Sequence, residues 1–269
     1  MRIMTWNINS VRLRQKLVLK AMKKLDADIV CLQETKSPDE HFPFQVFKDA
    51  GYEYIHACGM KGYNGVAILS RMPFHAIERW DRVGKSDCRH AAVQVKVKGL
   101  KKPLHIHNLY VPAGGDIPDV DANEKFAHKL DFVDELKSFF KDGYTSTDPM
   151  IVVGDFNIAP LEHDVWSHKQ LLDVVSHTPI EVNKLDGFQS SLKWVDAIRT
   201  FVPATEKLYT WWSYRNKDWK ASNRGRRLDH IWVTPPLKDK LKGFKILKES
   251  RDWEQTSDHV PVLLELNLQ

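Results

Sequence analysis

Short apolar segments rich in β-branched residues recur along the chain and constrain its fold more than any other feature. Eight of them stand out: 3–8, 29–32, 66–69, 92–97, 104–111, 151–153, 228–233 and 260–266. Some are continuously apolar, as strands buried on both faces are, and others alternate as half-buried strands do. Helical spacing is expected over 122–141, over 192–201, and after Ser10, which can cap a helix reaching residue 25. Many strands with few helices predict two packed sheets with helices outside them.

The chain has 269 residues, a length that allows one large domain or two small ones. Hydrophobic residues make up 42% and charged residues 28%, which excludes a disordered, collagen-like or coiled-coil chain. Region 159–190 is the least regular and is expected to be a loop-and-helix excursion from the sheets. Three widely spaced cysteines argue against a disulfide scaffold or a cysteine zinc site, and indicate a reducing compartment.

The net charge of +5 is mild, but basic residues are concentrated in particular segments. Residues 1–25 carry seven basic side chains and no acidic one, and 209–228 carry six against one. This concentration of positive charge indicates a polyanionic partner, although basic segments are often ordinary surfaces exposed to solvent. No secretory leader or membrane-spanning apolar run is visible, so a cytoplasmic protein is expected, associated with the nucleoid if the source is a bacterium.

Polar side chains stand at or beside the ends of several predicted strands. They are Asn7, Glu34, Tyr110, Asp155, Asn157, Asp229, Asp258 and His259. A carboxylate at the edge of a buried strand is costly unless it is paired or bound to a cation, so several of them suggest a shared cleft. Because these positions run from 7 to 259, a shared cleft needs both ends of the chain. We therefore expect one domain, 1–269.

The oxygen ligands in this set suit a hard cation. Glu34 and Asp258 offer carboxylates and Asn7 offers a carbonyl, a combination that favours Mg²⁺ or Mn²⁺ over zinc. His259 is adjacent to Asp258, but neighbours on a strand point to opposite faces, so Asp229 is the better candidate to orient its ring.

Together these residues resemble the exonuclease III family of abasic-site (AP) endonucleases, within the endonuclease/exonuclease/phosphatase superfamily. The resemblance covers residues 3 to about 264. It rests on the motifs at 7–9 (NIN), 32–36 (LQETK), 65–70 (GVAILS), 110–112 (YVP), 154–157 (GDFN) and 257–259 (SDH), with 209–215 and 223–229 extending it. It implies an α/β (α+β) four-layer sandwich, in which two mixed sheets are packed together and flanked by helices.

The resemblance also implies the reaction: hydrolysis of the DNA phosphodiester 5′ to an abasic site, leaving a 3′-hydroxyl, together with 3′→5′ exonuclease or 3′-end trimming on duplex DNA. Glu34 resembles the principal metal ligand, with Asn7 and Asp258 nearby. Asp155 would activate or orient the attacking water. Asn157 would help hold that water or the phosphate, and Tyr110 would approach the scissile phosphate. His259, oriented by Asp229, would stabilise charge on the phosphoryl oxygens. Either Asp155 or His259 could be the base.

For the substrate, the resemblance implies a pocket for the bare sugar at Trp211 and Leu228. Arg226 stands where many relatives have tryptophan or leucine, and Ala113 where they often carry an amide. Contacts to DNA phosphates are expected from Arg12, Gly62 and Tyr63.

The expected partner is double-stranded DNA with abasic sites or 3′ ends. The protein is expected to act as a monomer and not to bind a membrane. Two alternatives remain open: a phosphoesterase of the same superfamily with a non-DNA substrate, and a non-catalytic DNA-binding relative.

Overall fold

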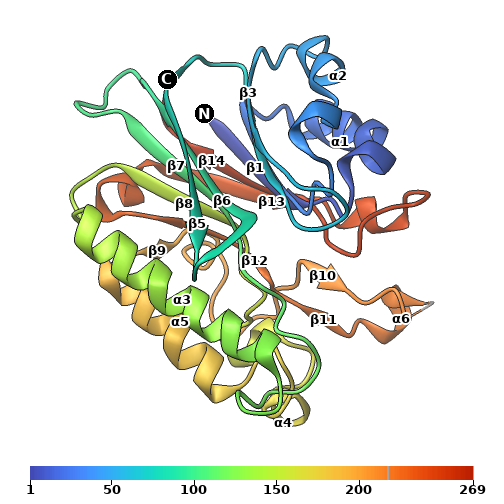
Figure 1. Ribbon diagram of the computed structural model, residues 1–269. Helices are drawn as coiled ribbons and strands as arrows, with labels where there is room; N and C mark the ends of the chain where they lie inside the picture. Colours follow the sequence, from blue (N-terminus) through green and yellow to red (C-terminus); the bar gives the residue numbers. More distant parts are fainter. Residues whose placement is uncertain (217, 269) are drawn as a thin grey trace.

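The computed structural model describes residues 1–216 and 218–268, and two six-stranded sheets form its centre (Figure 1). The first sheet contains, in spatial order, β13 (Leu241–Ile246), β14 (Val262–Leu266), β1 (Arg2–Asn7), β2 (Ile29–Gln33), β4 (Val66–Ser70) and β3 (Tyr54–Cys58). Strands β1 and β2 are parallel, and the other neighbouring pairs are antiparallel. This sheet therefore joins strands from both ends of the chain.

The second sheet is formed by the middle of the chain. Its order is β5 (Phe74–Arg82), β6 (Lys85–Val95), β7 (Leu104–Tyr110), β8 (Met150–Asp155), β12 (Asp229–Val233) and β9 (Val195–Asp196). Strands β7 and β8 are parallel, whereas β12 runs antiparallel to β8. The end of β8 therefore lies beside the end of β7 and the beginning of β12.

Helices cover the outer face of each sheet. On the first sheet, α1 (Val11–Leu25) and the short α2 (Phe44–Lys48) pack outside the strands, and on the second, α3 (Glu124–Gly143) and α5 (Pro179–Ser191) do so (Figure 1). The four-layer sandwich of two mixed sheets between helices is thus confirmed.

Continuous apolar runs follow from burial on both faces of the strands. Ile3 and Ile29 point into the core between the sheets, while the next residues, Met4 and Val30, pack in the cluster that includes α1. In the second sheet, Ile151 likewise faces the core between the sheets, and Val152 belongs to the cluster with α3 and α5. All eight predicted apolar segments form strands.

The helix expected over 192–201 was wrong. The helix in this region is α5, which ends at Ser191, and the following residues form β9 and turns. Thr178 and Glu181 form a capping box and Pro179 occupies the first turn, so the helix begins thirteen residues before the predicted start at 192. Lys193, with φ of +57°, has left-handed backbone that ends helical geometry.

Strand β5 was missed because it is an edge strand whose sequence, FHAIERWDR, is largely exposed and polar. Strands β3 and β13 lie at the edges of the other sheet.

Ser10 directly precedes α1, but its side chain makes no capping hydrogen bond. Instead the backbone N–H groups of Ser10 and Val11 donate to the carbonyls of Glu34 (2.7 Å) and Thr35 (3.0 Å), so the helix begins on the loop after β2.

Smaller elements complete the described chain. They are α4 (His168–Leu171), α6 (Trp219–Ser222), β10 (Trp211–Trp212), β11 (Gly225–Arg226) and 3₁₀ turns at Asp39–His41, Glu162–Asp164, Pro235–Lys240 and Lys248–Asp252. Within residues 1–216 and 218–268, no helix is long and apolar enough to cross a membrane.

Candidate active site

The polar residues predicted from strand ends come together where the two sheets meet. Asn7 ends β1, and Glu34 follows β2, which is parallel to β1. In the other sheet, Asp155 at the end of β8 is in register with Tyr110 at the end of β7 and with Asp229 at the start of β12. Each sheet therefore contributes part of a single group of side chains.

The amide of Asn7 joins the contributions of the two sheets. Its Nδ2 donates to Glu34 Oε1 (2.9 Å) and to Asp155 Oδ2 (2.8 Å), and the side chain is fully buried. Its carbonyl oxygen accepts the backbone N–H of Asn9 (3.1 Å). The amide thus holds two carboxylates near each other, and its oxygen keeps one lone pair besides the bond from Asn9.

Glu34 is surrounded by donors. Besides Asn7, the Tyr110 hydroxyl donates to Oε1 (2.9 Å) and the Lys36 ammonium lies 2.8 Å from Oε2. Burial alone would raise the pKa of Glu34, but Lys36 and the Asn7 hydrogen bond outweigh it and lower the pKa. For Tyr110, burial and the charges of Glu34 and Asp155 raise the pKa well above its usual value. At neutral pH the glutamate is therefore ionised and the phenol protonated.

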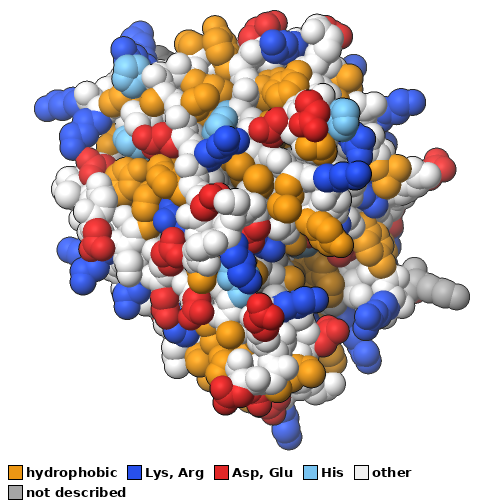
Figure 2. Space-filling model, viewed as in Figure 1, with side chains coloured by type: hydrophobic (Ala, Val, Ile, Leu, Met, Phe, Trp, Pro, Cys, Tyr) orange, Lys and Arg blue, Asp and Glu red, His pale blue; other side chains and the backbone are white. Residues whose placement is uncertain are grey.

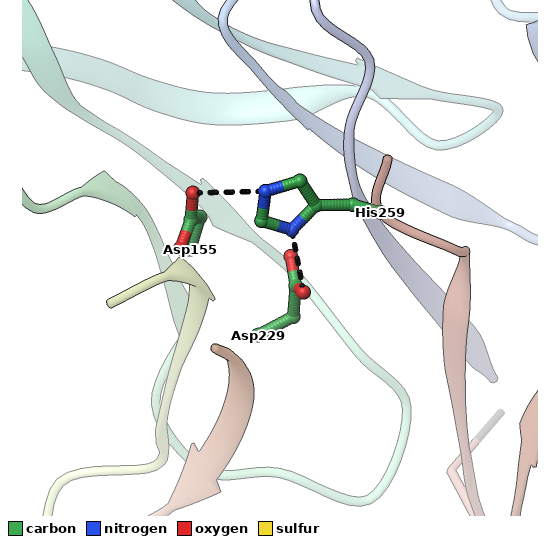
Figure 3. Close-up of side chains that lie close together, drawn as sticks. All are labelled: Asp155, Asp229 and His259. Atoms are coloured by element: carbon green, nitrogen blue, oxygen red, sulfur yellow. Dashed lines mark hydrogen bonds and ion pairs between the residues drawn. The ribbon is translucent and has the colours of Figure 1, made fainter. Parts of the chain in front are cut away.

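His259 lies between two carboxylates (Figure 3). Its Nδ1 is 2.8 Å from Asp229 Oδ2, and its Nε2 is 3.6 Å from Asp155 Oδ2. Burial disfavours the charged ring, yet the charges of Asp229 and Asp155 raise the pKa of His259 to about 10. Burial raises the pKa of Asp155 to about 7, although the His259 cation opposes that shift. The predicted pairing of His259 with Asp229 thus corresponds to a short contact, and the imidazole is cationic at neutral pH.

Two further predicted residues flank this group. Asn157, with left-handed backbone (φ +52°), donates its backbone N–H to Asp155 Oδ1 (2.9 Å) and its side-chain amide to Asp155 Oδ2 (3.2 Å). Asp258 accepts a hydrogen bond from the Trp211 indole N–H (2.9 Å) and, like Glu34, lines the adjoining cleft.

The donor set fits a hard cation at Glu34 and Asp258. Both carboxylates face the same cleft, and carboxylate oxygens with substrate or water oxygens are what Mg²⁺ prefers. Asp155, Asp229 and His259 also offer ligand atoms within 4.8 Å of one another. However, His259 already directs both ring nitrogens at those two carboxylates, so in its protonated form it has no lone pair to offer a metal there.

The cleft beside these residues has a volume of about 570 Å³. Trp211 and Leu228 line it, as predicted for a sugar pocket, and so do Arg226 and Ala113. The Arg226 guanidinium lies over the Trp211 ring, 5.4 Å from its centroid, and its Nη1 donates to the Val175 carbonyl (2.9 Å). A guanidinium therefore lies directly against the Trp211 wall of the pocket.

The other predicted DNA contacts lie outside the cleft lining. Arg12 is exposed in the first turn of α1, next to the loop that carries Glu34. Gly62 and Tyr63 are exposed on the loop between β3 and β4, and Tyr63 retains 71% of its accessible surface. Figure 2 shows basic and acidic side chains interspersed over the face in view, so the basic segments do not form one uniform patch there.

Only part of the predicted basic segments is available to a partner. Arg215 and Arg224 line the cleft, but Arg227 is buried and bonded to Asp164 and Asp196. Lys217, in the same segment, lies outside the described residues.

Three side chains at the site were not predicted. Lys36 pairs with Glu34, Arg89 lies over the Tyr110 ring at 4.7 Å, and the Ser257 hydroxyl donates to the backbone carbonyl of Asn7 (2.7 Å). Lys36 and Ser257 lie inside the LQETK and SDH motifs, so the sequence did indicate that they lie near the site. Arg89 lies in β6, away from every motif, and nothing in its sequence surroundings marks it.

Comparison with known proteins shows similarity along nearly the whole chain. Residues 4–259 match the endonuclease/exonuclease/phosphatase family. Exodeoxyribonuclease III of Haemophilus influenzae is 27% identical over 275 residues, covering 98% of this chain and 99% of the relative. Among solved structures, an AP endonuclease from Archaeoglobus fulgidus (TM-score 0.90, 29% identity) and a 3′ phosphatase from Neisseria bound to a product DNA hairpin (TM-score 0.88, 28% identity) each align over 99% of both chains.

Proposed function

The chain belongs to the endonuclease/exonuclease/phosphatase family, and we propose that it is a DNA-repair nuclease of the exonuclease III type. It would hydrolyse the phosphodiester 5′ to an abasic site in duplex DNA, leave a 3′-hydroxyl, and trim 3′ ends. The observation that carries this proposal is the single hydrogen-bonded group in which Asn7 links Glu34 of one sheet to Asp155 of the other.

Asp155 is the residue we assign to activate water. Hydrolysis of a phosphodiester needs a water aligned opposite the leaving oxygen and a nearby base to accept its proton. The carboxylate of Asp155 is held by Asn7 and Asn157, so its orientation is fixed before substrate binds. Its raised pKa, about 7, makes it a stronger base than an ordinary aspartate.

His259 is better suited to stabilise charge than to accept a proton. A ring flanked by Asp229 and Asp155 is held in its cationic form, which has no free lone pair. A fixed cation beside the scissile phosphate would stabilise the negative charge that develops on its oxygens. Asp229 orients the ring through Nδ1, which leaves Nε2 as the donor toward the substrate.

Glu34 and Asp258 are the residues we assign to hold Mg²⁺, with Mn²⁺ as a substitute, and Asn7 orients Glu34. When bound there, the cation would neutralise phosphate oxygens and stabilise the leaving alkoxide. Tyr110, a protonated phenol, lines the same cleft. Its single O–H donates to Glu34, so it would have to turn from Glu34 to donate toward the phosphate.

The cleft explains how an abasic nucleotide would be selected. A nucleotide that lacks a base costs less to rotate out of the helix, because it has no stacking to lose. Trp211 and Leu228 provide apolar walls for the bare sugar. Arg12, Gly62 and Tyr63 would hold the DNA backbone on either side without reading its sequence.

The same reasoning extends to organisation and location. Because Asn7 and His259 belong to one group of side chains, we propose a single domain spanning residues 1–269, and we propose that it works as a monomer. Its substrate implies action on chromosomal DNA in the cytoplasm, at the nucleoid of a bacterium.

The proposal is tested with a duplex that carries one abasic analogue in a labelled strand. With Mg²⁺ we expect a shortened labelled product whose 3′ end a polymerase extends, and with EDTA no product. The Asp155→Asn variant should be slower by on the order of 10²- to 10⁴-fold, since its amide cannot accept the proton. Asp148→Asn is the matched control, because Asp148 precedes the opposite end of β8 and bonds to Lys102.

Uncut DNA in the Mg²⁺ reaction, or equal rates for Asp155→Asn and Asp148→Asn, would overturn the assignment. Phosphate release from an inositol phosphate by a protein that leaves abasic DNA intact would instead favour the non-DNA phosphoesterase. Tight duplex binding without cleavage would favour a non-catalytic relative.

A further inference from the structure

One ion pair outside the proposed catalytic group is completely buried. It joins Lys129 of α3 to Glu181 in the first turn of α5, and neither side chain has any accessible surface. Removing two charges from water costs free energy that the attraction between them often fails to recover. A pair buried this deeply therefore calls for an explanation other than stability alone.

Lys129 connects two of the loops that form the site. Besides Glu181, its ammonium donates to the backbone carbonyls of Asn157 (2.8 Å) and Ala113 (3.2 Å). Asn157 lies two residues after Asp155 at the end of β8, and Ala113 follows the end of β7. All three donors of the ammonium are thus used, and two of them hold the chain directly beside the reacting groups.

Glu181 connects the pair to a third loop. Its carboxylate accepts the backbone N–H of Ser176 (2.9 and 3.0 Å), the backbone N–H of Thr178 (3.1 Å) and the Thr178 hydroxyl (2.7 Å). The Ser176 hydroxyl in turn accepts a hydrogen bond from Arg226 Nη1 (2.7 Å). Ser176 and Arg226 both line the cleft, so the carboxylate fixes one of its walls.

We infer that the Lys129–Glu181 pair is a positioning device for the proposed reaction: it sets the spacing between the Asn157 loop and the cleft wall at Ser176. Neither residue lines the cleft, so neither contacts substrate. The pair acts through Asn157, which holds the Asp155 carboxylate, and through Ser176, which holds Arg226. This inference rests on the proposed function, because it assigns a purpose to groups around the proposed base.

The test is Lys129→Met, which keeps the length of the side chain and removes its three donors. At a temperature where the variant is folded, kcat on the abasic duplex should fall by about 10- to 100-fold, because displacements near 1 Å around a reacting centre have effects of this size. KM should change by less than about threefold, since the outer phosphate contacts are unaltered. Backbone amide resonances of Asn157 and Ser176 should shift.

The matched control is Arg82→Met. Arg82 is also buried, pairs with Glu135 of the same helix α3 at 3.3 Å, and does not line the cleft. The Arg82→Met variant should have a lower melting temperature, with kcat and the Asn157 and Ser176 amide resonances as in the wild type. If Lys129→Met does not fold, Glu181→Gln, which keeps acceptors for Ser176 and Thr178, should show a smaller loss of kcat in the same direction.

Wild-type kcat for folded Lys129→Met, with unshifted Asn157 and Ser176 resonances, would overturn the inference, as would equal kcat losses for Lys129→Met and Arg82→Met. Wild-type protein that leaves abasic DNA uncut would overturn the proposed function instead. The resonances would still report in that case whether the pair positions the two loops.

Discussion

A single amide group decides how the carboxylates of the site face one another. Asn7 was predicted to offer its side-chain carbonyl to a metal. In the structure that oxygen accepts the N–H of Asn9, which leaves one lone pair, and the NH₂ donates to Glu34 and Asp155. The residue type and its place after β1 were evident in the sequence. Which amide atom faces which neighbour depends on the turn after the strand, which residue spacing does not specify.

His230 gives a pH dependence of stability that belongs to one residue. Burial lowers the pKa of His230 from 6.5 to about 4. Between these values the unfolded chain binds a proton that the folded protein does not, so the stability falls as pH decreases from 6.5 toward 4. The loss from this residue is on the order of 3 kcal/mol. Urea unfolding between pH 4 and 8 should therefore give a flatter curve for His230→Gln, and parallel curves would contradict the assignment.

At the scale of elements, the close packing of β7 and β8 fixes the position of Asp155. Gly154, next to Asp155, has φ of +140°, and a Cβ there would overlap the carbonyl oxygen of Leu109. Only glycine allows this combination of backbone angle and close approach. The GDFN motif thus contains a glycine required by the sheet immediately before an aspartate required by the chemistry.

Gly154→Ala should consequently damage both the fold and the site. We expect a loss of about 1–3 kcal/mol in the free energy of unfolding, because overpacked sites force the backbone to shift. Incision should fall as well, since the shift moves Asp155. Gly243→Ala is the control: it has ordinary φ and no atom within 4 Å of the added Cβ, so denaturant titration should show a change within about 0.5 kcal/mol. Equal effects would refute the packing explanation.

Sequence periodicity predicted the elements where burial is strong. The eight apolar segments became strands, whereas the polar edge strand β5 was missed and the helix expected over 192–201 does not form. Helix α5 lies almost entirely within 159–190, the region expected to mix loops and helices. Edge strands have one partner and one solvated side, so their sequences lack the apolar signal of central strands. The start of α5 depends on the capping box of Thr178 and Glu181, which is a local signal in an otherwise irregular segment.

For the whole molecule, convergence of the site residues was suggested by their places at strand ends and implied by the resemblance, whereas periodicity did not predict it. Asn7 and His259 are separated by almost the entire chain, and no local pattern specifies that they meet. Their proximity comes from strand order, because β14 pairs with β1 at the centre of the first sheet. The charge prediction held only in part, since basic residues such as Arg227 are used inside the fold.

DNA binding should depend on salt in a way that distinguishes surface charges. The logarithm of the binding constant should fall linearly with the logarithm of salt concentration, because phosphate contacts release counterions. Arg12→Ala should reduce the magnitude of this slope by about 1. Lys98→Ala, just beyond β6 at the end of the sheet away from Tyr110, should leave the slope unchanged. Fluorescence anisotropy with uncleaved duplex in EDTA gives both slopes, and identical changes would remove Arg12 from the interface.

The pairing of β14 with β1 has a consequence for the order of synthesis. Strand β1 must wait for β14, which follows the other described strands in the sequence, and His259 lies just before β14. A chain interrupted anywhere earlier lacks the imidazolium between Asp229 and Asp155, however well its middle sheet has formed. A fragment that ends before residue 259 could therefore complete the second sheet and still lack the fixed cation proposed to act on the scissile phosphate.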